Sequence, residues 1–195
     1  MTRTLHEWES RYQSGETGWD RGASSPSLSA WLSNDGIAHG SRILVPGCGR
    51  GHEVVHLAEL GFDVAGIDIA PSAVTHLQQV LMDKGLKAKV LHADLFEFRP
   101  ETPFDAVYEQ TCLCAIQPAQ REAYEALLHD WIRPGGTLFA LFMQTGAEGG
   151  PPFHCDLLAM RRLFPESRWA WPVTEPVFTP HRNGRFELGY QLIRT

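Results

Sequence analysis

Short apolar runs alternate with helical patterns of hydrophobic residues from about residue 42 onward. The apolar runs lie at residues 42–45, 63–67, 89–91, 104–108 and 137–143. Between several of them, apolar side chains recur every three or four positions, as on one face of an α-helix. This alternation is typical of βαβ units, and it predicts a doubly wound, mostly parallel α/β sheet.

Glycine and proline mark the expected ends of the helices. Gly61 and Gly85 are expected to end two helices, and Pro71 and Pro118 are expected to open two. Residues 133–136 (RPGG) predict a turn before the fifth strand.

The C-terminal part of the chain departs from this alternation. It offers a helix at about residues 157–164 and two strand candidates at 168–173 and 186–193. We expect these two strands to form an antiparallel hairpin at one edge of the sheet.

The N-terminal forty residues have their own character, with many tryptophans and a short helical pattern at residues 27–33. Leu5, Trp8 and Tyr12 share one face of an earlier helix. The whole chain, 1–195, is expected to be a single domain in which residues 1–40 form a lid.

Composition restricts the class of protein. The chain has 195 residues and a formal charge of −6, and no basic run occurs, so we expect no nucleic-acid partner. A signal peptide and an apolar stretch of about 20 residues are both absent, which favours a cytoplasmic protein without a membrane span. We expect a monomer. The cysteines lack the spacing of disulfide frameworks and zinc sites, and we expect them to serve packing or pocket lining: Cys48, Cys112, Cys114 and Cys155.

The strongest chemical signal is the segment LVPGCGRGHEV, in which Gly47, Gly49 and Gly51 stand between a predicted strand and a predicted helix. Glycines let the backbone turn tightly there, and the helix N-terminus offers N–H groups to an anion. A dinucleotide fingerprint needs glycine where His52 stands. The pattern therefore favours a carboxylate over a pyrophosphate.

Two acidic residues follow the glycine segment at the ends of later strands. Asp68 ends the second predicted strand, where a carboxylate can accept hydrogen bonds from both hydroxyls of a ribose. Asp94 follows the third strand, where an acid and the next backbone N–H can bind an adenine edge. Together these positions predict a nucleoside site.

A competing motif overlaps the glycine segment. Residues His52-Glu53-Val54-Val55-His56 match the H-E-x-x-H helix of zinc proteases. The motif begins directly at a glycine loop, and residue 59 is Glu where the extended protease motif has Gly. We therefore expect no metal, and a zinc metalloprotease is kept as the less favoured alternative.

Together the motifs resemble the thiopurine S-methyltransferase superfamily, most closely its halide/thiol methyltransferase branch. The likeness covers most of the chain and is carried by Trp8-x3-Tyr12-x2-Gly15, Trp19-Asp20-x-Gly22, VPGCGRGHEV, GIDIA, ADLF, CAIQP, RPGG and GGPPF. The resemblance implies a class I, Rossmann-like methyltransferase fold with a seven-stranded sheet and an N-terminal helical lid. It also implies S-adenosylmethionine as the cofactor.

The resemblance assigns seven residues to the cofactor: Trp8, Tyr12, Trp19, Gly47, Asp68, Asp94 and Leu95. The glycine segment adds Gly49 and Gly51, and Glu109 is also expected to contact the cofactor. Two departures affect the acceptor side, because Tyr12 stands where plant-type relatives usually have Trp, and Glu109-Gln110 replaces an expected Asp-Tyr.

The implied reaction is an in-line methyl transfer to a small soft nucleophile of the thiol, sulfide, halide or thiopurine type. Such a displacement depends mainly on positioning in a closed, dry pocket. No His–Asp dyad is evident near the glycine loop, and no catalytic residue is assigned. Trp8 and Trp19 are pocket candidates, together with Tyr12, Gln110, Cys112 and Phe153. A non-enzymatic nucleoside-binding module is the alternative from a different class of protein.

Overall fold

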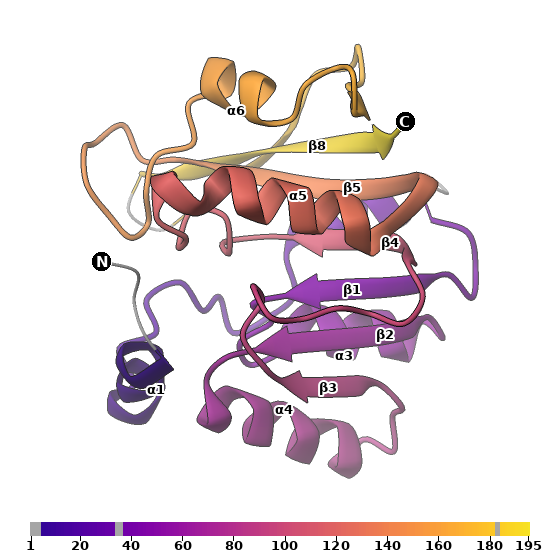
Figure 1. Cartoon of the computed structure of the whole chain (residues 1–195). Coiled ribbons are helices and arrows are strands. Elements are labelled where there is room, and N and C mark those ends of the chain that lie inside the picture. Colours follow the sequence, from indigo (N-terminus) through magenta and orange to yellow (C-terminus); the bar gives the residue numbers. More distant parts are fainter. Residues whose placement is uncertain (1–4, 34–36, 182–183) are drawn as a thin grey trace. The chain divides into compact units, whose positions relative to one another are not determined.

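The computed structural model describes residues 5–33, 37–181 and 184–195. The chain forms two compact units, Met1–Arg99 and Pro100–Thr195 (Figure 1). Residues 1–4 and 34–36 of the predicted lid segment lie outside the described residues.

The first unit contains three parallel strands in the order β3-β2-β1. These are β1 (Arg42–Pro46), β2 (Asp63–Asp68) and β3 (Lys89–His92). In β1 and β2 every residue after the first is buried, as expected for strands covered on both faces. The three strands lie where the apolar runs predicted them, with one more residue at each C-terminal end.

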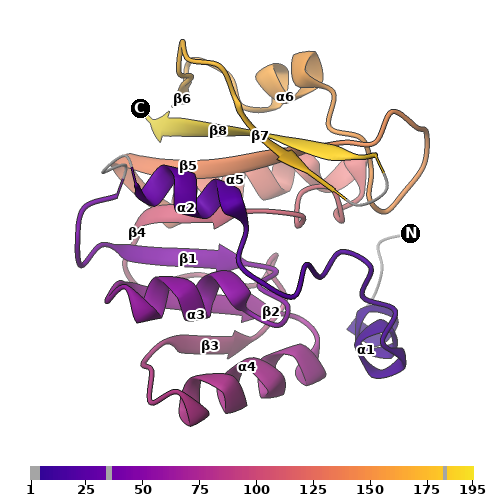
Figure 2. The ribbon, with the colours of Figure 1, turned by 180° about the vertical axis from the view of Figure 1, so that it is seen from behind.

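Two helices of this unit follow β1 and β2. Helix α3 (His52–Glu59) packs on β2, and α4 (Pro71–Asp83) packs on β2 and β3. Figure 2 shows α3 in front of the strands. Gly61 and Gly85, just beyond the two helices, have φ angles of +83° and +64°. Both helices therefore end at the glycines that the sequence indicated.

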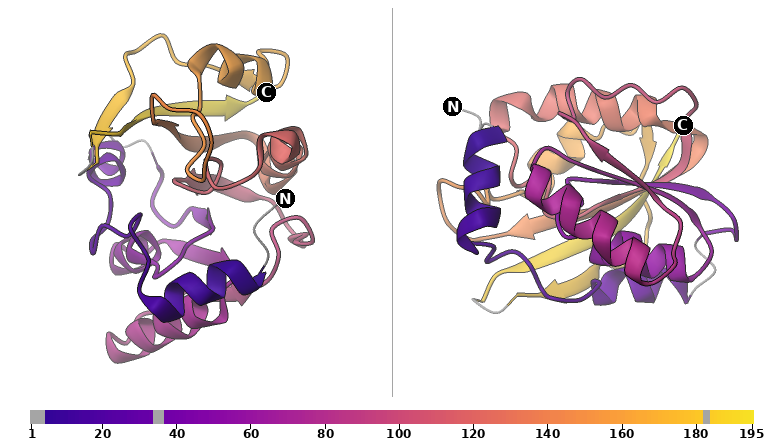
Figure 3. Two further views of the ribbon diagram at one scale, coloured as in Figure 1. Left: turned by 90° about the vertical axis from the view of Figure 1, so that its left-hand side faces the viewer. Right: turned by 90° about the horizontal axis from the view of Figure 1, so that it is seen from below.

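The N-terminal segment contributes α1 (Leu5–Ser14) and α2 (Pro26–Leu32). Helix α2 is buried through Leu28 and Trp31, whereas α1 has no buried residue. Helix α1 lies beside the beginning of α4 (Figure 3), where the Glu9 carboxylate accepts hydrogen bonds from the backbone N–H of Ser72, at 2.9 Å, and from its hydroxyl. Helix α1 is therefore held by polar contacts to the N-terminus of α4, where a carboxylate is favoured.

The second unit is a mixed sheet. Strands β4 (Phe104–Glu109) and β5 (Ile132–Gln144) are parallel, and β8 (Phe186–Arg194) pairs antiparallel with β5. A 3₁₀ turn at Pro118–Gln120 leads into α5 (Arg121–Trp131), which packs on β4 and β5. The short helix α6 (Leu157–Leu163) follows the long loop after β5.

The sequence predictions were wrong at two places in this unit. Residues 133–136 are not a separate turn, because β5 begins at Ile132 and includes them. They form an irregularity in the strand: Ile132 pairs with Phe104 of β4, and the next paired residue of β5 is Thr137, opposite Ala106. The strand expected at 168–173 shrinks to β6 (Trp169–Ala170), and β7 (Val177–Pro180) was not predicted. Both β6 and β7 pair antiparallel with β8. The described residues therefore form eight strands instead of seven.

The core of the second unit is rich in aromatic side chains. Phe142 packs against Phe164, with ring centroids 5.7 Å apart, and Phe164 packs edge-on against Trp169 at 5.8 Å. All three are fully buried. Parallel pairs among β1–β5, helical crossovers and an antiparallel C-terminal part define a Rossmann-like α/β fold. Among the described helices, none is both long and apolar enough to span a bilayer.

Candidate cofactor site

The glycine loop joins β1 to α3 and requires glycine at three positions. Gly47, Gly49 and Gly51 have φ angles of +57°, +54° and +75°, a region that side-chain-bearing residues rarely occupy. A Cβ at Gly51 would lie 2.3 Å from the Leu77 side chain, so this glycine allows α4 to pack closely. A Cβ at Gly49 would lie 2.7 Å from the Tyr12 hydroxyl.

Asp68, the last residue of β2, holds the glycine loop. Its Oδ2 accepts a hydrogen bond from the Gly49 N–H at 2.8 Å, and its Oδ1 accepts one from the Ala70 N–H at 2.9 Å. The side chain is buried, and burial raises the pKa of Asp68, although these backbone N–H groups oppose the rise. Each carboxylate oxygen keeps a second lone pair, which can accept a hydrogen bond from a ribose hydroxyl.

Asp94 and Leu95 follow β3 directly. The Asp94 Oδ1 accepts a hydrogen bond from the Phe96 N–H at 2.9 Å, so the carboxylate fixes its own turn. The Ala93 N–H donates to the Asp68 carbonyl at 3.1 Å. The structure therefore brings the two predicted acidic positions to adjacent strand ends, with Asp94 half-buried.

Three aromatic residues of the N-terminal segment form one cluster. The Trp19 ring meets Trp8 and Tyr12 edge-on, with centroids 5.5 and 5.7 Å apart. The Arg11 guanidinium lies over Trp19 at 5.1 Å. Burial and then the nearby Asp68 carboxylate raise the pKa of Tyr12 well above its usual range, so its hydroxyl is protonated at neutral pH. These are the three aromatic residues that the sequence assigned to the cofactor.

Asp20 ties this segment to the glycine loop. Its Oδ1 lies 2.8 Å from the His52 Nε2 and accepts a hydrogen bond from the Gly22 N–H at 2.8 Å. Its Oδ2 lies 3.3 Å from the Arg50 guanidinium. Burial acts to raise the pKa of Asp20, but these hydrogen bonds and positive charges outweigh it, and the pKa is lowered.

No His–Asp pair was evident from the sequence near the glycine loop, but the structure forms one between His52 and Asp20. His52 and Asp20 are 32 residues apart, and only the tertiary fold brings them together. The sequence did carry a local signal, because Asp20-x-Gly22 is typical of a turn in which Asp binds the backbone two residues later.

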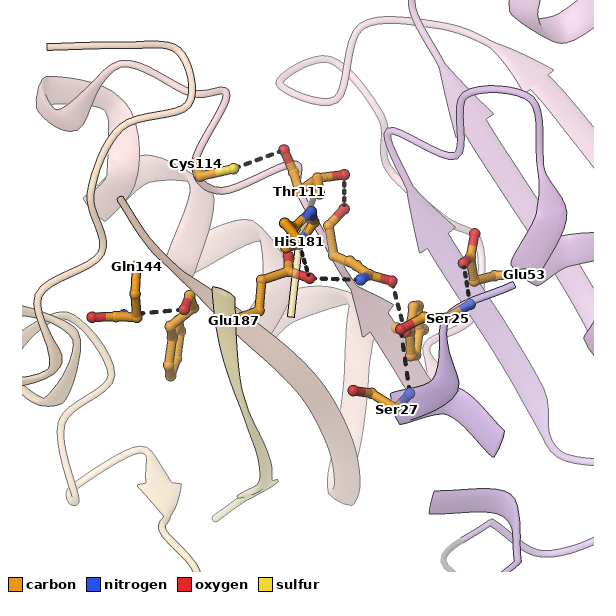
Figure 4. Close-up of polar contacts among 11 residues, drawn as sticks. Ser25, Ser27, Glu53, Thr111, Cys114, Gln144, His181 and Glu187 are labelled. Atoms are coloured by element: carbon orange, nitrogen blue, oxygen red, sulfur yellow. Dashed lines mark hydrogen bonds and ion pairs between the residues drawn. The ribbon is translucent and has the colours of Figure 1, made fainter. Parts of the chain in front are cut away.

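The H-E-x-x-H residues have other partners in the structure. Glu53 accepts a hydrogen bond from the Ser25 N–H at 3.0 Å, at the N-cap of α2, as Figure 4 shows. His52 is paired with Asp20, and His56 is half-buried in α3. In the described parts of the chain, no group of three or more His, Cys, Asp and Glu side chains is arranged to hold a metal ion.

The remaining candidates lie in the second unit. Glu109 ends β4 and is buried, with its Oε1 accepting a hydrogen bond from the Leu113 N–H at 2.6 Å. The Gln110 Oε1 accepts from the Tyr108 hydroxyl at 2.8 Å. Cys112 is buried, and Phe153 is held by its N–H, which donates to the Cys114 carbonyl at 2.7 Å. The loop that contains Cys112 and Cys114 is therefore in contact with the GGPPF loop, residues 149–153.

Two polar residues beside Gln110, Glu187 and His181, carry no signal in the sequence. The Gln110 Nε2 donates to Glu187 Oε2 at 2.7 Å, and the His181 Nε2 lies 2.9 Å from the same oxygen (Figure 4). Glu187 is in β8, 77 residues from Gln110, and lies in a strand without any recognisable motif. Its fully buried carboxylate could be identified only from the fold.

The first unit fits S-adenosylmethionine. The Gly49 backbone sits between the Asp68 carboxylate and the Tyr12 hydroxyl, in a space that any Cβ would fill. Aromatic rings suit a sulfonium cation, a helix N-terminus suits a carboxylate, and Asp68 suits a ribose. Nine of the ten expected cofactor residues lie in this unit; only Glu109 lies in the other.

Solved structures of similar shape support the fold. One similar structure was determined in work on the conversion of a disulfide bond into a thioacetal group during echinomycin biosynthesis. It superposes with a TM-score of 0.79 at 22% sequence identity, and the match covers 98% of this chain and 92% of that chain. Another is the Burkholderia thailandensis 1,6-didemethyltoxoflavin-N1-methyltransferase with bound S-adenosylhomocysteine, with a TM-score of 0.78 and 19% identity, over 98% and 87%.

Sequence relatives identify the family. Thiocyanate methyltransferase 1 of Arabidopsis thaliana is 32% identical, over 97% of this chain and 86% of that protein. Thiopurine S-methyltransferase of Pseudomonas putida (strain W619) is 29% identical, over 86% and 84%. The thiopurine S-methyltransferase family profile matches residues 3–185. The chain therefore belongs to the thiopurine S-methyltransferase family and is an S-adenosylmethionine-dependent methyltransferase.

Proposed function

We propose that this enzyme transfers a methyl group from S-adenosylmethionine to a small sulfur nucleophile. The observation that carries the proposal is the near full-length similarity to relatives named for methylation of thiocyanate and of thiopurine sulfur. Both named acceptors are soft sulfur nucleophiles. The family profile across residues 3–185 supports the same class of acceptor.

Residues of the first unit are proposed to bind and orient the cofactor. When bound, S-adenosylmethionine supplies an electrophilic methyl group on a sulfonium. Asp68 accepts hydrogen bonds from the ribose, Asp94 and the Leu95 N–H bind the adenine, and the glycine loop accommodates the methionine carboxylate. Trp8, Tyr12 and Trp19 exclude water and face the cation. Gln110, Cys112 and Phe153 are proposed to contact the acceptor.

A turnover screen tests the acceptor class. Purified enzyme is incubated with S-adenosylmethionine and, one at a time, sulfide, thiocyanate, an alkyl thiol, a thiopurine, iodide and a chalcogen oxyanion. Release of S-adenosylhomocysteine is then measured. We expect turnover with at least one sulfur acceptor, whereas turnover confined to the non-sulfur acceptors, or absent with all six, contradicts the proposal.

We further propose that the enzyme acts as a monomer on free small molecules. The formal charge of −6 supports a free small-molecule acceptor over a nucleic acid, because nucleic-acid phosphates are bound by clustered basic side chains. Sedimentation velocity across a hundred-fold range of protein concentration is expected to give one species of about 22 kDa, the mass of one chain. A species of twice that mass at working concentrations contradicts the monomer.

A further inference from the structure

The Tyr12 side chain approaches the glycine loop with its hydroxyl, within the first unit. A Cβ built on Gly49 would lie 2.7 Å from the hydroxyl oxygen and 3.8 Å from the ring carbon that carries it. The polar end of the side chain, and not the face of the ring, is therefore the part nearest the loop. This feature is separate from the aromatic contacts that Tyr12 makes through its ring.

The glycine loop uses several of its own N–H groups inside the protein. The N–H of Cys48 donates to the Ile67 carbonyl at 3.0 Å, and the N–H of Gly51 donates to the Cys48 carbonyl at 2.9 Å. The N–H of Gly49 donates to the Asp68 carboxylate at 2.8 Å. An anion at this loop therefore gains from a donor supplied by another segment of the chain.

The hydroxyl of Tyr12 has a proton to donate. Its oxygen accepts a hydrogen bond from the Trp19 ring N–H, which can only donate. Over residues 5–33, 37–181 and 184–195, its own O–H donates to no protein acceptor. The Trp19 N–H thus occupies the oxygen and leaves the O–H proton for a ligand.

The surroundings of Tyr12 keep this proton in place. Burial, and then the Asp68 carboxylate, raise the pKa of Tyr12, although the hydrogen bond from Trp19 acts in the opposite direction. The phenol is therefore a neutral donor throughout the physiological pH range. A neutral donor can bind an anion without adding a charge of its own to the site.

The basic side chains nearest to the loop already have partners. The Arg50 guanidinium lies 3.3 Å from one oxygen of Asp20, and the His52 ring lies 2.8 Å from the other. The Arg11 guanidinium lies over the Trp19 ring at 5.1 Å. These contacts leave the Tyr12 hydroxyl as a donor that is both placed at the loop and uncommitted.

The chemistry of the cofactor decides which group can receive the proton. S-adenosylmethionine has one anionic group, the carboxylate of its methionine part, whereas its ammonium and sulfonium are positively charged and accept no hydrogen bond. Its ribose and adenine are assigned above to Asp68, Asp94 and Leu95. A hydrogen bond to an ionised acceptor is about twice as strong as one between neutral groups. The carboxylate is therefore the best match for the hydroxyl.

We propose that the Tyr12 O–H is the donor that recognises the methionine carboxylate of the cofactor, and that Trp19 positions this hydroxyl. The proposal rests on the cofactor orientation proposed above and deepens it. It gives Tyr12 a specific role in ligand selection. The hydroxyl favours adenosyl thioethers that carry a carboxylate over those that lack one.

The test compares two ligands in one variant. Tyr12→Phe keeps the ring and removes the O–H. Calorimetry is performed with S-adenosylhomocysteine and with S-adenosyl-3-thiopropylamine, which keeps the ammonium and lacks only the carboxylate. In the variant we expect S-adenosylhomocysteine to bind about ten-fold more weakly and the analogue to stay within about two-fold of the wild type, as for loss of one hydrogen bond to a charged acceptor.

The positioning role of Trp19 has its own readout. Trp19→Phe keeps an aromatic ring and removes the N–H that holds the Tyr12 oxygen. We expect the preference for S-adenosylhomocysteine over the analogue to fall about three-fold in this variant. In Tyr12→Phe/Trp19→Phe the preference should fall no further than in Tyr12→Phe alone, because the two residues act through one hydroxyl. Additive losses of preference contradict the positioning role.

Tyr190→Phe is the matched control for loss of a tyrosine hydroxyl. Tyr190 lies in the second unit, where its ring packs against Phe142 and Trp171, with centroids 6.0 and 5.3 Å away. This variant should bind both ligands as the wild type does. A change of preference in Tyr190→Phe equal to that in Tyr12→Phe contradicts a specific role for Tyr12.

Three outcomes overturn the proposal. Equal losses for both ligands in Tyr12→Phe give the hydroxyl a structural role only, and unchanged affinity for S-adenosylhomocysteine shows that other groups hold the carboxylate. If Tyr12→Phe does not fold, wild-type enzyme that binds the analogue as tightly as S-adenosylhomocysteine has the same force. The expected binding pattern without turnover of any sulfur acceptor supports this proposal and contradicts the proposed acceptor class, so the two can fail separately.

Discussion

The contact between Tyr12 and Gly49 joins the N-terminal segment to the loop expected to bind the cofactor. In Gly49→Ala, the new methyl group would lie 2.7 Å from the Tyr12 hydroxyl, so the ring must move, and a φ of +54° strains the alanine. We expect affinity for S-adenosylhomocysteine, measured by calorimetry, to fall at least ten-fold.

Gly85→Ala is the matched control for that change. Its φ is +64°, but nothing lies within 4 Å of the new methyl group. It should therefore carry a similar backbone strain and a similar loss of melting temperature, with unchanged affinity. If a folded Gly49→Ala variant binds S-adenosylhomocysteine as tightly as the wild type, the glycine loop is not part of the cofactor site.

Glu109 also makes the stability of the folded chain depend on pH. Its folded pKa of about 8 lies above the ordinary value of 4.5, so the folded state keeps a proton that the unfolded state releases. The free energy of unfolding must then fall as pH rises from about 4.5 to 8. From pH 6 to 8 the expected loss is about 2 kcal/mol, given 1.36 kcal/mol per pKa unit.

Urea unfolding at pH 6 and pH 8 measures this loss. Because histidines titrate in the same range, the informative quantity is the difference between wild type and Glu109→Gln. The variant should lack about 2 kcal/mol of the pH-dependent loss. If both proteins lose stability equally, the Glu109 carboxyl is already ionised at pH 6.

At the scale of elements, α1 and the loop after it are held to the rest of the first unit by few contacts. Glu9, Asp20 and the aromatic cluster connect this segment to the first unit, and α1 itself buries no residue. Segments with few buried contacts open with little free energy. We expect hydrogen exchange across residues 8–22 to slow markedly when S-adenosylhomocysteine is added, because the ligand covers the aromatic cluster.

Trp19→Ala tests the same segment by substitution. It removes the ring that contacts Trp8 and Tyr12, and it should weaken S-adenosylhomocysteine more than it lowers the melting temperature. Trp171→Ala is the counterpart in the second unit, where Arg161 lies over the ring at 4.5 Å as Arg11 lies over Trp19. That variant should lose stability and keep its affinity. If hydrogen exchange across residues 8–22 is the same with and without S-adenosylhomocysteine, the segment has only a structural role.

Elements with a strong local signal were predictable, and pairs distant in sequence were not. Strands β1 and β2 are buried almost throughout, so their apolar runs located them to within a residue. Strand β7 has four residues and ends in proline, and its pairing with β8 is decided by tertiary contact. The acids at the ends of β2 and β3 followed from spacing, whereas the partners of Asp20 and Gln110 lie 32 and 77 residues away.

At the scale of the whole molecule, the metal question can be settled by analysis of the intact enzyme. His52 and Glu53 have hydrogen-bond partners in the N-terminal segment, and this occupies two of the three residues that a zinc protease would use. We expect well under one zinc per chain after purification without added metal. A chelator should leave methyl transfer unchanged, and stoichiometric zinc lost together with activity would contradict this reading.

The buried cysteines have a consequence for an enzyme that handles an electrophile. The thiolate, not the thiol, attacks an alkyl donor, and burial raises the pKa values of Cys114 and Cys155, the latter to about 11. Both side chains therefore stay protonated, although they belong to the unit that carries the acceptor candidates. The fold thereby protects the enzyme from alkylating itself, and a preparation kept for long periods with its methyl donor should retain unmodified cysteines.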